Sequence, residues 1–205
     1  KGPDYGYPTE KVTVANQDYD GRVKGDTTVI SGNYDHFVKL VPMWQLQLYC
    51  HQAGFSPDVY AKLHQAVRTG NYSGLTNGQM QMRFMKTICD STRLDFTEFF
   101  EKAGMLRPIN AYIQDYSPGW NKINEAMIQE LKSHVVAQGY PKPEGEVNYI
   151  SALNWKTYAD RLPLSGTLND GCTKTNNSAK GFVKVLHSKW KNVVAFETYD
   201  AEGKL

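Results

Sequence analysis

The pattern of apolar and polar positions predicts helices over most of the first two thirds of the chain. From His36 to Ala53, apolar side chains occupy most of a helical circumference, which is typical of a central, buried helix. Pro42 has no backbone N–H to donate, so we expect a kink there or the first turn of the helix. Gly54 then ends it.

Three shorter helices are expected next, each with an apolar stripe and a start or stop signal. They cover about 56–70, 79–91 and 95–104. Ser56 followed by Pro57 is a typical helix start, with a hydroxyl cap and then proline in the first turn. Asp95 is expected to cap the third helix, and Glu98 three residues later would complete a capping box.

The most regular apolar repeat predicts a fifth helix from about Trp120 to Gln138. Its apolar positions recur every four residues at Ile123, Met127, Leu131 and Val135. Gly139 and a nearby proline should end it. Because short connectors join the five helices, we expect an antiparallel array around a shared core.

The two ends of the chain have a different character. Residues 1–35 are rich in glycine and polar side chains and predict an extended lead-in to a helical subdomain at 36–145. Residues 146–205 predict a β-rich tail with strands near 182–187 and 192–199, a loop at 163–180, and a strand or short helix at 147–155. The turn expected at residues 200–203 is followed by only two residues, which suggests that the β-sheet of the tail is incomplete in this sequence. The expected fold class is therefore mainly α, with a small β-rich tail.

Composition narrows the function classes. The 205 residues are 40% hydrophobic and 12% aromatic, which is enough for a real core. With 23 basic and 21 acidic residues, the chain lacks the broad basic surface of a nucleic-acid binder. The sequence contains no run of 18 apolar residues, so it predicts no membrane-spanning helix. Three cysteines exclude a disulfide scaffold and leave open either a Cys50–Cys89 bridge or buried thiols.

No catalytic or metal-binding motif is present in the sequence. A zinc peptidase helix needs H-E-x-x-H, yet no two of the five histidines are four residues apart. The G-x-S-x-G, P-loop and dinucleotide-binding patterns are also missing. Acidic residues gather at Asp90, Asp95, Glu98 and Glu101, which we interpret as helix caps and a solvated face. The sequence therefore assigns no catalytic residue and no metal ligand within this chain.

Four residues are candidates for substrate binding. Asp115, Tyr116 and Trp120 lie in a polar and aromatic connector, where side chains are free to meet a ligand. Gln45 places an amide on a mostly apolar helix, where it needs a partner. A purely structural role remains the alternative, in which the aromatic rings seal the helix array and Asp115 accepts from backbone donors.

Several stretches of the sequence resemble one family. Residues 37–49, FVKLVPMWQLQLY, are similar to the Leu-Val-Pro-Phe-Trp-Gln-Leu-Gln-Leu-Tyr helix of enhancin-like metallopeptidases. The resemblance covers about 30–145 well and the remainder loosely. It includes Cys89-Asp90, the 94–100 helix, Asp115-Tyr116, Trp120, the GYPKP run at 139–143 and residues 192–200.

The resemblance implies a peptidase function, but this chain lacks the zinc-binding motif that the function needs. The family includes secreted zinc enzymes of gut bacteria that cut mucin-type glycoproteins, and its members carry H-E-x-x-H and a further glutamate before the Trp-Gln helix. This chain has no such motif. We therefore expect this chain to be the non-catalytic carboxy-terminal part of a secreted or cell-surface bacterial peptidase. Its partner would be an upstream catalytic region of the same polypeptide, and zinc would be bound in the full-length parent. In that parent, Tyr116 would offer a hydroxyl to the oxyanion.

Other readings remain open from the residues alone. The chain could be a relative that lost its zinc site and kept a binding scaffold. A cell-surface adhesin or carbohydrate-binding module would use exposed Tyr and Trp rings as sugar platforms. A structural spacer would use the same rings as core.

Overall fold

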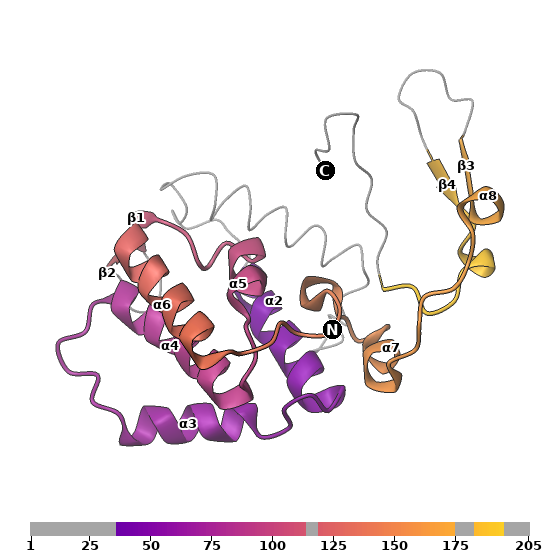
Figure 1. Ribbon diagram of the computed structural model, residues 1–205. Coiled ribbons are helices and arrows are strands. Elements are labelled where there is room, and N and C mark those ends of the chain that lie inside the picture. The colour runs from indigo at the N-terminus through magenta and orange to yellow at the C-terminus, as the bar shows by residue number, and fades with distance from the viewer. Residues whose placement is uncertain (1–35, 114–118, 175–182, 195–205) are drawn as a thin grey trace.

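The computed structural model describes residues 36–113, 119–174 and 183–194 (Figure 1). Helices dominate, as the sequence predicts, and two short antiparallel strand pairs complete the structure. The helical part contains α2 (His36–Gln47), the π-helical segment η2 (Leu48–Gln52), α3 (Val59–Thr69), α4 (Asn77–Thr92), α5 (Thr97–Lys102) and α6 (Glu125–Gln138). None of the helices in these described ranges is long and apolar enough to cross a membrane.

The first helix is central, as its apolar circumference predicts. Pro42 lies inside α2 without ending it, and the helix widens into η2 six residues later. Local π-helix of this kind is rare, and it often occurs at functional sites. Leu46 and Tyr49 are fully buried, and Gly54 adopts the positive φ of +81° that the helix end requires.

Aromatic rings fill the core between η2 and α5. Tyr49 stacks on Phe55 with ring centroids 4.2 Å apart and meets Phe96 edge-on at 5.9 Å. Phe99 and Phe100 continue the cluster at 5.4 Å from each other. Edge-to-face and stacked contacts each add stability beyond area burial, so these rings hold the helices in register.

The capping box lies on a different helix from the one expected. Thr76 and Gln79 form it reciprocally at the start of α4. At the expected site, Asp95 Oδ1 accepts from the backbone N–H of Thr97 at 2.9 Å, and the helix begins at Thr97 with no side-chain cap. The prediction failed because Asp95 lies one residue before the N-cap position, so its oxygen closes a turn instead.

The predicted start of the fifth helix is wrong. Residues Gly119–Ile123 form strand β2, which pairs antiparallel with β1 (Ile109–Ile113), and α6 begins only at Glu125. Asn124 caps it by accepting from the N–H of Met127 at 3.0 Å. Ile123 fits both a helical repeat and the inward face of a strand, so periodicity alone placed it in the helix. The predicted end is confirmed, since Gly139 is left-handed with φ of +66°.

The tail is small and only partly strand. Its elements are η3 (Val147–Tyr149), α7 (Trp155–Asp160), α8 (Leu168–Gly171), β3 (Cys172–Lys174), β4 (Val183–Val185) and η4 (His187–Lys189). The expected loop at 163–180 thus contains α8 and β3, and residues 192–194 of the expected last strand are not strand. The rest of that strand and the final turn lie outside the described residues, as does the 1–35 lead-in.

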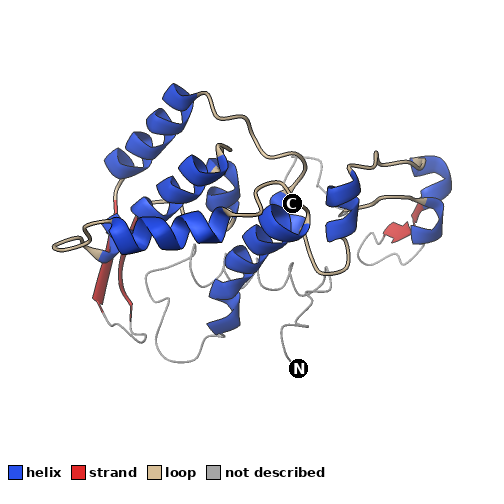
Figure 2. Ribbon diagram, turned by 90° about the horizontal axis from the view of Figure 1, so that it is seen from below, coloured by secondary structure: helices blue, strands red, loops and turns tan. Residues whose placement is uncertain are grey.

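The described tail has two parts. The first, through α7, packs on the helical core, since Tyr158 of α7 is buried and meets the Tyr49 ring edge-on at 6.2 Å. The second, with α8, β3 and β4, extends away from the core (Figure 2). The boundary expected near residue 145 stays a prediction.

Candidate substrate-binding site

The hairpin of β1 and β2 stands at one end of the helical core, beside the start of α4 (Figure 1). Its two faces differ. Asn121 and Ile123 point inward and are almost completely buried. Asn110, Tyr112, Trp120 and Lys122 alternate with the inward residues and are all exposed.

The inward face is fixed to α4 by a close backbone approach. A Cβ added to Gly78 would lie 1.9 Å from the carbonyl oxygen of Lys122, so only glycine fits in the first turn of α4. Beside it, Asn121 donates through Nδ2 to Oε1 of Gln81 at 2.9 Å. Gln81 in turn donates to the carbonyl of Met105 at 2.7 Å. These contacts hold the hairpin as a rigid arm of the helical core.

The outward face carries two aromatic rings and a cation. Tyr112 and Trp120 are directly opposite each other on the two strands, with ring centroids 5.8 Å apart and planes at 78°. Trp120 is 55% exposed and Tyr112 is 49% exposed. The ammonium of Lys122 lies 5.3 Å from the centroid of the Trp120 ring. Large exposed rings are unusual in a core-forming sequence and suit contact with a ligand.

The structure distributes the four predicted binding residues unevenly. Trp120 is exposed on β2, whereas Gln45 is buried and donates through Nε2 to the carbonyl of Asn148. Gln45 thus finds the partner that its burial demands, and it ties α2 to η3. Asp115 and Tyr116 lie outside the described residues, in the segment that joins the two strands. Whether these four bind substrate stays a prediction.

Two polar atoms near Gln45 are buried without a hydrogen-bond partner among the described residues. They are Nε1 of Trp44 and Oε1 of Gln45 itself. Asn148 is better satisfied, since its side chain also donates to the carbonyl of Phe99 at 3.3 Å.

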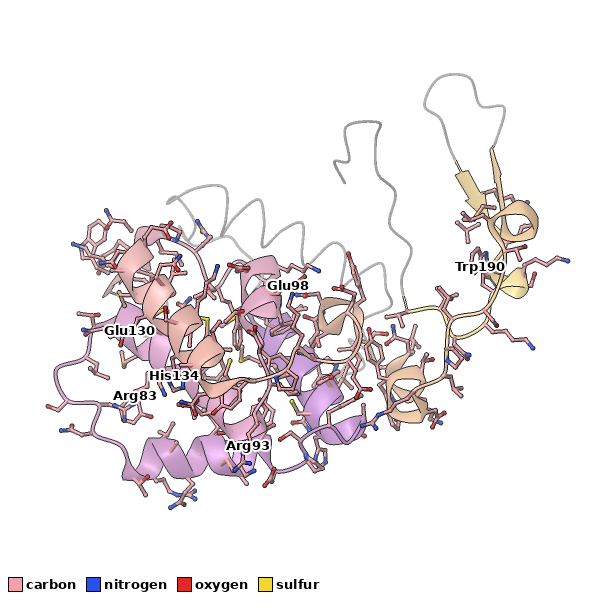
Figure 3. All side chains as sticks on the ribbon, in the orientation of Figure 1. Arg83, Arg93, Glu98, Glu130, His134 and Trp190 are labelled. Carbon is pink, nitrogen blue, oxygen red and sulfur yellow. The ribbon has the colours of Figure 1, made fainter. Side chains whose placement is uncertain are left out.

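A second polar cluster joins α4 to α6. Asp90 accepts from Nε2 of His134 at 2.6 Å, from the hydroxyl of Tyr140 at 3.1 Å and from Lys86 at 2.5 Å. Burial opposes ionisation of Asp90, but the hydrogen bonds from Lys86 and His134 outweigh it and lower the pKa of the carboxyl. His134 and Arg83 both line a groove of about 870 Å³ between the two helices (Figure 3).

Glu98 and Glu101 of the predicted acidic cluster are also paired with lysines. The carboxylate of Glu98 binds Lys142 at 2.8 Å and Lys102 at 3.2 Å. Hydrogen bonds from these two lysines lower the pKa of Glu98. Glu101 pairs with Lys132 across to α6. The acidic residues therefore tie helices together at the surface, in keeping with their interpretation as caps and solvated side chains.

The three cysteines are free thiols, so the Cys50–Cys89 disulfide that the sequence allowed is not formed. Both residues are buried, and burial raises the pKa of each thiol to about 12. Cys172 begins β3 and is partly exposed. In the described part of the chain, no three His, Cys, Asp or Glu side chains are placed to hold a metal.

Sequence reasoning missed Asn110, Tyr112 and Lys122. Only a partial signal was present, because INAYI alternates with a period of two, whereas GWNKI has Gly119 and Asn121 at inward positions and shows no apolar alternation. The four-residue apolar repeat of the following helix extended backwards over the second run and concealed it.

Comparisons with known proteins found one family model and several solved metallopeptidases. The family model described as Peptidase M60, enhancin and enhancin-like, matches residues 8–104. A metallopeptidase solved in complex with Tn antigen shares the fold, with a TM-score of 0.59 and 19% identity, covering 81% of this chain and 36% of that one. A metallopeptidase from Bacteroides thetaiotaomicron gives a TM-score of 0.59 and 18% identity, covering 88% and 35%. Among curated proteins, none matches this chain.

The chain thus spans about a third of the length of these solved metallopeptidases. At such identities the solved structures show the shared fold, and the family model adds the sequence relationship over α2, α3, α4 and α5. The resemblance of residues 37–49 to this family is confirmed by the family-model match, which includes them. Residues 8–104 of this chain therefore match the enhancin-like M60 peptidase family.

Proposed function

We propose that this chain forms the non-catalytic, substrate-facing helical part of an enhancin-like zinc metallopeptidase that acts on mucin-type glycoproteins. The observation that carries this proposal is the shared fold with a metallopeptidase solved in complex with Tn antigen, a glycan borne on protein. The M60 family match over residues 8–104 supports it. A bacterial enzyme of this kind would work outside the cell, secreted or at the cell surface.

The zinc of the family has no fitting site among the residues described here. The sequence lacks H-E-x-x-H, and no two of its five histidines are four residues apart. Among the described residues, no group of three His, Cys, Asp or Glu side chains is placed to hold a metal. We therefore assign zinc, and the glutamate that activates its water, to an upstream catalytic region of a full-length parent.

The role of this chain is to present groups to the substrate. Trp120, on a hairpin fixed to α4, offers an aromatic face to the glycan. Asp115 and Tyr116 follow β1 in the sequence and belong beside the same substrate, with the Tyr116 hydroxyl available to the oxyanion. Gln45 is buried and contributes indirectly, because its hydrogen bond to the carbonyl of Asn148 holds η3 against α2.

The test compares peptide cleavage by the parent and by the 205-residue chain. The substrate is a peptide with N-acetylgalactosamine on one threonine, and its control is the same peptide without sugar. We expect the parent to cut the glycopeptide, a chelator to abolish cleavage, and the 205-residue chain alone to cut neither. Cleavage by the short chain, or a parent that ignores the sugar, would contradict the proposal.

A binding module without peptidase activity is the second candidate, and the exposed Tyr112–Trp120 pair favours it. The same experiment separates the two candidates. A parent that binds the glycopeptide tightly and never cuts it would support the adhesin.

A further inference from the structure

The second part of the tail extends away from the helical core (Figure 2), and we call its residues 161–174 and 183–192 the tail arm. Its two sides are joined where Ser165 and Lys191 exchange backbone hydrogen bonds at 2.9 and 3.2 Å. Trp190 packs against the arm itself, because a Cβ added to Gly166 or Gly171 would collide with its indole ring. Backbone pairing and one tryptophan therefore organise the tail arm.

Three leucines of the tail arm face solvent. Leu162, Leu164 and Leu168 are 48%, 61% and 71% exposed, and every residue from 161 to 168 is exposed. In the helical core, by contrast, every leucine that the structure describes between residues 41 and 138 is buried or half-buried. Single exposed leucines are common on protein surfaces, but several in one short segment mark a surface that contacts something else.

The same segment concentrates positive charge. Between residues 161 and 194 the sequence has six Lys or Arg residues and one acid, Asp170, so its formal net charge of +5 exceeds the +2 of the whole chain. Lys184, Lys189 and Lys191 are exposed, and no carboxylate in the part of the chain that the structure describes pairs with them. Many lysines of the helical core are instead paired with carboxylates, namely Lys62, Lys86, Lys102, Lys132 and Lys142.

The fold brings the leucines and the lysines together. The bridge between Ser165 and Lys191 lies one residue from Leu164 on one side of the arm and two residues from Lys189 on the other. The short helix α8, which begins at Leu168, packs against η4, which ends at Lys189. Apolar and cationic side chains therefore share one small, exposed part of the molecule.

The partner of this surface has to accept both kinds of side chain. A soluble polyanion would bind the lysines and leave the leucines in water, whereas an apolar protein groove would bind the leucines and leave the charges unmatched. The surface of an anionic bilayer accepts both, because its head groups attract lysines and its acyl boundary takes up apolar side chains. We propose that the tail arm attaches this chain to the surface of a membrane that contains anionic lipids. The proposal goes beyond the peptidase function and does not depend on the glycoprotein substrate.

The test is co-sedimentation of the 205-residue chain with two kinds of lipid vesicle. One kind contains equal parts of phosphatidylglycerol and phosphatidylcholine, and the other contains phosphatidylcholine alone. At low salt we expect the anionic vesicles to bind the chain at least about tenfold more tightly, because each lysine near an anionic surface contributes about three- to fivefold. This preference should largely disappear near 1 M salt, where the Debye length is about 3 Å.

Two variants of the tail arm assign the binding to residues, and each has a matched control on the helical core. Lys191→Gln should weaken binding to the anionic vesicles by about three- to fivefold, whereas Lys122→Gln, on β2, should not change it. The double variant Leu164→Ser and Leu168→Ser should weaken binding by about tenfold, because less apolar surface enters the bilayer. Its control is Val136→Ser on α6, where the valine is 77% exposed, and it should bind as the wild type does.

Several outcomes would overturn the proposal. Absence of binding to anionic vesicles, or equal binding to both kinds, would remove the membrane as partner. Wild-type binding by the leucine variant, together with equally tight binding of the chain to dextran sulfate, would assign the lysines to a soluble polyanion. A dimer in light scattering that the leucine variant dissociates would assign the leucines to a second copy of the chain. All the substituted side chains are exposed, so the variants should keep the wild-type unfolding midpoint, which is measured alongside.

Discussion

Replacing Gly78 by alanine tests how the hairpin is attached to the helical core. The new methyl carbon would lie 1.9 Å from the Lys122 carbonyl oxygen and 2.7 Å from its carbon. Both atoms are backbone, so the clash is relieved only by moving β2 away from α4. Overpacking of this kind costs about 1–3 kcal/mol, whereas alanine gains at most about 1 kcal/mol of helix propensity over glycine. The net expectation is a loss of about 1–2 kcal/mol.

Urea unfolding of Gly78→Ala and of Met80→Ala measures this directly. Met80 lies two residues along the same helix and is 39% exposed, so its truncation should change the unfolding free energy by less than about 0.5 kcal/mol. A hairpin moved off α4 should also lose the hydrogen bond between Asn121 and Gln81. If Gly78→Ala is as stable as the wild type, or more stable, β2 does not pack on the backbone of α4.

Further predictions concern the core, pH and thiol reactivity. Tyr49→Phe should cost about 1–3 kcal/mol in urea unfolding, because the N–H of Glu144 loses its acceptor. The pKa of Asp90 is lowered from its usual 3.8, so its stabilising contribution is complete above that value and is lost as pH falls through the lower folded pKa. Asp90→Asn should therefore be less stable than wild type at pH 7, with the gap closing below about pH 3.8; a constant gap would contradict this. Cys50 and Cys89 should resist a thiol reagent at pH 8 until the chain unfolds, and rapid labelling of the native protein would refute their burial.

The helices were predictable where one face is apolar over several turns. From residue 41 to residue 50, in α2 and η2, every side chain is buried or half-buried, and the apolar sequence there shows this directly at positions such as Leu46 and Tyr49. The left-handed stop at Gly139 was equally visible, because glycine adopts a positive φ without strain. These features depend on local sequence and burial alone.

The hairpin could not be recovered in the same way. Its strands are five residues each and carry their stability in contacts with α4, which are distant in sequence. In the sequence, Gly78 looks like an ordinary residue near the start of a helix. The need for glycine there becomes clear only from its contact with the backbone carbonyl of Lys122. Likewise, Gln45 looked available to a ligand until η3 covered it. Tertiary contacts, which local patterns do not encode, decided both.

The central claim is that this chain faces a glycosylated substrate, and the most direct measurement is calorimetric titration with a matched pair of peptides. One peptide carries N-acetylgalactosamine on threonine, and the other is identical without the sugar. We predict that the 205-residue chain binds the glycopeptide more tightly and that Trp120→Ala removes the difference while the unfolding midpoint stays constant. Equal affinity of the wild-type chain for the two peptides would contradict the account.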